Sequence, residues 1–155
     1  LYGASNHKLT EIMKEANSKM SGKQVRLRMN KGITGLGRLS EVVTKAAERG
    51  WIKSLAGYRV PVRSPHSALN FLLQSSGSIL MKTALNIFHF DIAPDVPFSY
   101  CANVHDEVQI TCRPDDADTV GVAFANAIGL AGVKLKLNCP TSGSHDIGDN
   151  WRETH

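Results

Sequence analysis

The feature that most constrains this chain is a pair of acidic residues set between two short apolar runs. Residues 100–104 and 108–112 form the runs, and His105, Asp106 and Glu107 lie between them. Because alternate residues in each run suit half-buried strands, the sequence predicts a hairpin with two carboxylates at its turn. The alternating positions are Cys101, Asn103, Val108, Ile110 and Cys112. Mg²⁺ is held by one or two carboxylates together with substrate phosphates, so the turn is interpreted as either a metal site or a solvated pair of acids.

The composition favours a globular chain that binds a polyanion. Its 155 residues are 42% hydrophobic, which is enough for a core, and its net charge of +4 favours an acidic partner. The three cysteines include no CxxC pair, so neither a zinc cage nor a disulfide framework is indicated. We expect a location in the reducing cytoplasm, because the cysteines suggest no disulfide framework, and no membrane partner, because no apolar run approaches about 18 residues.

Helical and alternating patterns are mixed along the chain, and they predict an α+β fold. A first amphipathic helix is expected over residues 7–20, followed by a Gly-rich basic stretch and a second helix that Gly50 terminates. Residues 51–62 suit a hairpin turning at Ala56 and Gly57. A third helix is expected from Ser64 as N-cap and Pro65 as first residue to about Phe88. Asp115 and Asp116 should begin a last helix, and Val133, Leu135 and Leu137 should form a strand.

The third helix carries three polar side chains at a spacing of four. His66, Asn70 and Gln74 are each turned about 40° from the last and rise about 6 Å per step, so they line one side of an otherwise apolar helix. We call these three residues the polar rail. Side-chain amides could bond the minor-groove acceptors that nearly every DNA base pair presents, which would test pairing without reading sequence. The alternative interpretation is a solvated polar stripe.

Four blocks of the sequence together resemble the family A DNA polymerases, the bacterial DNA polymerase I family, and most closely the replicative polymerases of bacteriophages. The first is the opening Leu1-Tyr2-Gly3-Ala4, which is similar to the end of the fingers helix. The second runs from Arg63 to Asn70 with residues 72–75 behind it, like the helix that contacts the primer–template minor groove. The third is the His-Asp-Glu turn, and the fourth comprises Gly148, Asn150, Trp151 and His155.

This resemblance implies a polymerase palm and part of the fingers, with residues 1–50 in the fingers and residues 51–155 in the palm. It implies nucleotidyl transfer with two Mg²⁺ ions, for which Asp106 and Glu107 would be metal ligands and His105 would steady the turn or approach the primer end. Tyr2 and Gly3 resemble residues beside the templating base. Lys53, Arg59 and Arg63 would join the polar rail in binding primer–template DNA. Deoxynucleoside triphosphates are the implied second substrate, and the host cytoplasm is the implied location if a phage encodes the chain.

The sequence departs from the family where a working enzyme needs further residues. The other catalytic aspartate and the fingers Lys and Arg that hold the triphosphate are absent, and Asp91 and Asp95 are expected in a connecting loop because of Pro94 and Pro97. We therefore expect a C-terminal fragment that is inactive without an N-terminal polymerase portion. The alternative function is a non-catalytic nucleic-acid-binding module derived from the same scaffold.

Overall fold

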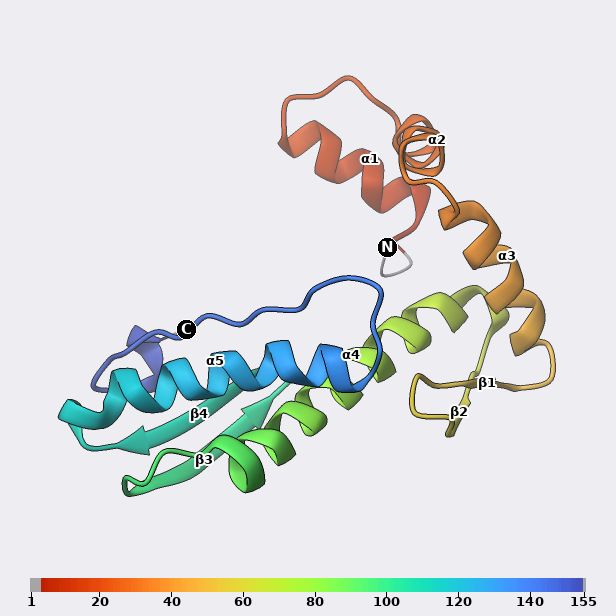
Figure 1. The fold of residues 1–155 in the computed structure, drawn as a ribbon. Helices are drawn as coiled ribbons and strands as arrows, with labels where there is room; N and C mark the ends of the chain where they lie inside the picture. The colour runs from red at the N-terminus through yellow and green to blue at the C-terminus, as the bar shows by residue number, and fades with distance from the viewer. Residues whose placement is uncertain (1–3, 155) are drawn as a thin grey trace. The chain divides into compact units, whose positions relative to one another are not determined.

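A computed structural model describes residues 4–154 (Figure 1). The chain divides into two compact units, residues up to Ser75 and residues from Ser76 onward, and the division falls inside helix α4 (Ala68–Ile87). The described residues combine helices with two two-stranded antiparallel sheets, so the predicted α+β class is confirmed. None of the described helices has the length and apolarity that a membrane crossing requires.

The first unit begins with two short helices where the sequence predicted one helix and a basic stretch. Helix α1 (Asn6–Glu15) starts after its Ser5 N-cap but ends five residues before the predicted limit of residue 20, and Asn17 takes a left-handed φ of 54°. Helix α2 (Gly22–Gly32) starts at a capping box in which Ser21 and Gln24 satisfy each other's backbone N–H groups. This helix was not predicted because its apolar pattern is weak, although the Ser-x-x-Gln signature was present.

Helix α3 (Leu36–Ala47) and the hairpin of β1 (Trp51–Lys53) and β2 (Arg59–Pro61) confirm two predicted elements. Gly50, at a φ of 84°, makes the chain reversal between helix and strand. The turn of this hairpin is longer than the predicted two residues, Ala56 and Gly57, since β1 ends at Lys53 and β2 begins at Arg59. Within the turn the Ser54 hydroxyl accepts from the Tyr58 N–H, and the Gly57 N–H donates to the Ser54 carbonyl. The core of this unit comprises Val43, Ala47, Ile52, Val62 and Ala68.

The long helix begins differently from the prediction. Pro65–Ser67 is a 3-10 turn, and the α-helix starts only at Ala68. Ser64 holds the predicted N-cap position, but its side chain makes no capping hydrogen bond; instead its carbonyl accepts from the Ser67 hydroxyl at 2.7 Å. At the other end, α4 passes into a π-helical turn, Phe88–Ile92.

The second unit packs helix α5 (Ala117–Lys134) against the hairpin of β3 (Phe98–Val104) and β4 (Glu107–Cys112) (Figure 1). A 3-10 turn, Pro114–Asp116, leads into α5, as the acidic helix start predicted. Phe88 is fully buried at the centre, and its ring centroid lies 5.2 Å from that of Phe98 and 5.3 Å from that of Phe124. The core around it comprises Met81, Ala84, Ile87, Val120, Ala127 and Ala131.

Two details of this unit differ from what the sequence predicts. The pairing of β3 with β4 shifts between Tyr100 and Ala102, so Cys101 is a bulge residue; it and Asn103 are exposed and not half-buried. The predicted strand over residues 133–137 is instead the end of α5, where Leu135 is the C-cap and Lys136 is left-handed. The Leu137 N–H bonds the Gly132 carbonyl at 3.0 Å, so this apolar alternation closes a helix.

Candidate active site

The acidic hairpin forms as predicted and presents one carboxylate at its tip. Val104 pairs with Glu107 across the two strands, which leaves His105 and Asp106 as a two-residue loop. His105 takes a φ of 56°, a left-handed conformation that histidine adopts more readily than most side chains do. Asp106 is exposed, and within the described part of the chain its carboxylate has no hydrogen bond or ion pair. The turn therefore leaves Asp106 available to a ligand.

Glu107 differs from Asp106, because protein groups already hold its carboxylate. The Trp151 indole Nε1 donates to Glu107 Oε1 at 2.8 Å, and the side-chain amide of Gln109 donates to the same oxygen. The Thr154 hydroxyl in turn donates to Gln109 Oε1 at 3.3 Å. The residues that end the described chain thus fix the side chain beside the hairpin tip. Sequence spacing gave no signal for this contact, since Trp151 was singled out only as part of the family's chain end.

An extended segment follows α5 and runs back along it (Figure 1), and Trp151 at its far end bonds Glu107 of the hairpin. The segment is held to α5 where the Thr141 hydroxyl donates to the Ile128 carbonyl at 2.8 Å and where His145 Nε2 lies 2.9 Å from Asp118 Oδ1. A side chain at Gly121 would collide with the His145 ring. Small residues on α5 therefore let the segment approach the helix backbone closely, and the segment in turn positions the Trp151 indole.

The carboxylates fit part of a magnesium site. No cluster of three or more Cys, His, Asp or Glu side chains able to hold a metal occurs among residues 4–154. Mg²⁺ takes only one or two carboxylates when phosphates supply other ligands, and an exposed Asp106 suits one such position. Glu107 suits a supporting place, since its oxygen already accepts two hydrogen bonds.

The polar rail is less regular than the sequence predicted. His66 lies in the 3-10 turn before α4, so only Asn70 and Gln74 share the α-helical spacing. Gln74 and His66 are exposed, whereas the Asn70 side-chain oxygen is buried without a hydrogen-bond partner among the described residues. Such an unsatisfied acceptor costs about 1–3 kcal/mol. The structure thus keeps the rail's amides on one helix but removes the histidine from it.

The predicted basic contacts lie on and after the β1–β2 hairpin. Lys53 and Arg59 face each other across the two strands, and Arg63 follows β2 by two residues. All three side chains are exposed.

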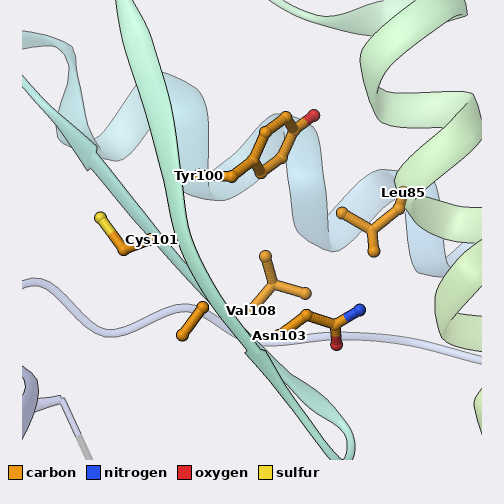
Figure 2. Close-up of a pocket in the computed structure, with 6 residues that line it drawn as sticks. Leu85, Tyr100, Cys101, Asn103 and Val108 are labelled. Atoms are coloured by element: carbon orange, nitrogen blue, oxygen red, sulfur yellow. The ribbon is translucent and has the colours of Figure 1, made fainter.

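A pocket of about 340 Å³ opens between α4 and the β3–β4 hairpin. Figure 2 shows Leu85, Tyr100 and Val108 turned toward its space, while the Cys101 sulfur points away from it. Partial burial raises the pKa of the Tyr100 hydroxyl above its usual 10.0, and this hydroxyl lies 3.4 Å from His89 Nδ1. No pattern in the sequence indicated this mostly apolar surface, because its residues come from separate elements.

Known proteins resemble this chain along its whole length. The chain is 30% identical to the DNA-directed DNA polymerase of Enterobacteria phage T3 over 178 aligned residues, which cover all of this chain and 25% of the relative. The same figures hold for the DNA-directed DNA polymerase of Escherichia phage T7. Among solved structures, the POL domain of Pol1 from M. smegmatis, in complex with DNA primer-template and dNTP, superposes with a TM-score of 0.67 at 18% identity. That superposition covers 99% of this chain and 29% of the other. Over its whole length the chain is therefore similar to the family A DNA polymerases. No family model matches it.

The chain spans about a quarter of the length of these phage relatives. Its α+β architecture is that of a family A polymerase domain, as the superposition shows. Tyr2 and Gly3, predicted beside the templating base, and His155 at the chain end lie outside the described residues.

Proposed function

We propose that this chain forms the palm and part of the fingers of a DNA-directed DNA polymerase that adds deoxynucleotides to a primer with two metal ions. Residues 1–50 belong to the fingers in this proposal, and residues 51–155 belong to the palm. The observation that carries it is the exposed Asp106 at a tight hairpin tip, beside a Glu107 that Trp151 and Gln109 hold in place.

The three residues of the acidic turn have different roles in this proposal. Asp106 is the carboxylate available to a metal, and Glu107 assists it or binds the metal through water. His105 steadies the turn or approaches the primer end. Mg²⁺, when bound, would supply the positive charge that stabilises the attacking primer oxygen and the leaving phosphate of an in-line displacement. The protein's contribution is to hold the carboxylates rigidly, which the hydrogen bonds to Glu107 support.

The DNA and nucleotide partners follow from the remaining predicted residues. His66, Asn70 and Gln74 would meet the primer–template minor groove, and Lys53, Arg59 and Arg63 would meet phosphates. The exposure of Gln74 and of the three basic side chains supports these contacts. Tyr2 and Gly3 keep their proposed place beside the templating base and the incoming deoxynucleoside triphosphate. The reaction would take place in the host cytoplasm.

A further polymerase portion is needed in this proposal to complete the site. Among residues 4–154 the β3–β4 sheet has only two strands, so each strand has one edge without a partner strand, where a further strand could pair. The apolar pocket beside the hairpin is likewise a surface that a neighbouring segment would cover. The added portion would supply the second aspartate and the triphosphate clamp.

Primer extension tests the proposal. The pure 155-residue chain with Mg²⁺ and four nucleotides should give no product, whereas a chimera joining it to the remainder of the phage T3 polymerase should extend the primer. Asp106-dependent extension by the chain alone would contradict the need for another portion. A chimera that folds and binds primer–template yet never extends it would favour the alternative, a non-catalytic nucleic-acid-binding module.

A further inference from the structure

The β1–β2 hairpin has one face in the core and one face outside it. Ile52 and Val60 oppose each other across the strands, and Ile52 is only 3% exposed within the core cluster. Neighbouring positions on a strand point to opposite faces, so Trp51, Lys53 and Arg59 all project from the outer face. The hairpin therefore presents one aromatic and two basic side chains together.

Two guanidinium groups lie over the Trp51 ring. The Cζ atom of Arg49 is 3.6 Å from the ring centroid, and the Cζ atom of Arg59 is 4.6 Å from it. Arg49 Nε also donates to the Trp51 carbonyl at 3.1 Å. A guanidinium that lies over an aromatic face keeps the N–H groups at its edge free to bond a second partner, and it loses much of its rotamer freedom in advance.

The positive charge of this face is not neutralised within the described part of the chain. Arg49, Lys53 and Arg59 are exposed, and none of them forms an ion pair with any residue from 4 to 154. Three cations gathered at one hairpin repel one another, so an anion that bridges them would be favoured. Trp51 is half-buried and is not part of the core cluster.

We propose that Trp51 is a positioning residue that orients Arg49 and Arg59 to bind neighbouring phosphates of the DNA backbone. The inference rests on the proposed function for the choice of DNA as the polyanion. It adds to that function two residues, Arg49 and Trp51, that the sequence did not single out. It also gives Arg59 a reason to be arginine, since a lysine ammonium has no plane to stack and no fork to bond two phosphate oxygens.

Salt dependence of DNA binding distinguishes positioning from simple charge. The 155-residue chain would be titrated into a fluorescein-labelled primer–template, with anisotropy measured between about 50 and about 200 mM NaCl. Arg49→Ala and Arg59→Ala should each reduce the slope of log K against log salt by about 0.9, the value for one lost phosphate contact. Trp51→Ala removes no charge, yet it should reduce the slope by at least as much, because both arginines lose their orientation. Trp51→Phe, which keeps an aromatic face, should restore most of the slope.

A control variant and a second pair of variants complete the test. Lys8→Ala removes a cation that already pairs with Glu11 at 3.5 Å, and it should leave the slope unchanged. Arg49→Lys and Arg59→Lys keep the charge but lose the planar group, and each should weaken binding about fivefold. These two variants carry the test if Trp51→Ala fails to fold by circular dichroism.

Three results would overturn the inference. Trp51→Ala could keep the parental slope of log K against log salt, both lysine variants could bind DNA as tightly as the parent, or the parent chain could fail to bind the primer–template at about 50 mM NaCl. The readout needs no catalysis, so it separates the two proposals. If Trp51→Ala binds DNA normally and primer extension by the chimera depends on Asp106, only the positioning role is rejected. If Trp51→Ala loses DNA binding and the chimera does not extend a primer, the polymerase role is rejected and Trp51 remains part of a DNA-binding surface.

Discussion

The Trp151 indole donates a hydrogen bond to Glu107 across 44 residues of sequence, with 2.8 Å between Nε1 and Oε1. This bond links the last described turn of the chain to the residue beside the hairpin tip. Because the Gln109 amide donates to the same carboxylate oxygen, Glu107 is held from two directions. The end of the chain is therefore part of the candidate site.

Removal of the indole donor should weaken this link while an aromatic ring is kept at the position. Trp151→Phe should lower the free energy of unfolding by about 1 kcal/mol, since the ring is 46% exposed and the bond is partly screened by solvent. Combined with Glu107→Ala in a double-mutant cycle of urea unfolding, it should give a coupling energy of similar size. A coupling near zero would show that the indole and the carboxylate do not stabilise each other in solution.

Alanine substitutions at two helix glycines should differ in their effect on stability, because the extended segment lies close to α5 at Gly121 and nothing outside its own helix lies close to α4 at Gly77. In Gly121→Ala the new methyl group would meet the His145 ring, so the extended segment must shift and the free energy of unfolding should fall by about 1–3 kcal/mol. Gly77→Ala is the matched control, because its added Cβ would meet no described atom within 4 Å beyond its chain neighbours and its own turn of helix backbone, and alanine favours a helix by up to about 1 kcal/mol. Equal thermal midpoints for the two variants would contradict the close packing of His145 on α5.

The sequence predicted most elements because they follow local patterns, and it failed where contacts distant in sequence decide. Alternation of apolar residues predicted the acidic hairpin, and helical spacing predicted α3, α4 and α5. The same alternation over residues 133–137 gave a strand that does not form, since it cannot distinguish a strand from a helix end closed by the left-handed Lys136. The bulge at Cys101 left no local signature, so the exposure of that residue was missed.

Alkaline pH should destabilise the chain through Cys112. Burial, with a smaller contribution from Asp116, raises the pKa of this thiol above its usual 9.0, so the folded state prefers the neutral form. The unfolded chain loses the proton first, and this stabilising contribution is present below about pH 9 and is lost as the pH rises through the folded pKa. Cys112→Ala should therefore show a smaller fall in the urea midpoint between about pH 7.5 and about pH 9.5 than the parent does. Parallel falls in both proteins would assign the pH effect to other groups.

Gln74 tests the polar rail. A side-chain amide can donate to the minor-groove acceptor of every correct pair, so Gln74→Ala in the chimera should weaken primer–template binding by about 1 kcal/mol. It should also narrow the difference in extension rate between matched and mismatched primer ends. A carbon isostere of purine N3 at the terminal pair should reproduce the defect in the parent and add nothing in the variant.

The control for Gln74 is Asn86→Ala, which removes another exposed amide from the same helix and should leave the discrimination of mismatches unchanged. Fully additive effects of Gln74→Ala and the base analogue would contradict the minor-groove contact and indicate that the polar rail is an ordinary polar helix face.

The site was predictable only in its local part. The acidic pair and its turn could be read from adjacent residues, and so could the four-residue spacing of Asn70 and Gln74. The role of Trp151 could not, since it depends on the path of a segment along α5 that no periodicity encodes. His66 was placed on the helix by spacing alone, but the chain between Pro65 and Ser67 takes a tighter 3-10 turn.

Single-turnover primer extension by the chimera, with and without Asp106→Asn, tests the central claim most directly. Loss of the carboxylate should lower the chemical rate by about two orders of magnitude or more, while DNA affinity stays equal or rises slightly because a repelling charge is gone. Asp91→Asn, an exposed aspartate in the π-helical turn after α4, serves as the matched control and should keep the parental rate. A near-parental rate in Asp106→Asn would contradict the account and reduce this hairpin to a structural turn.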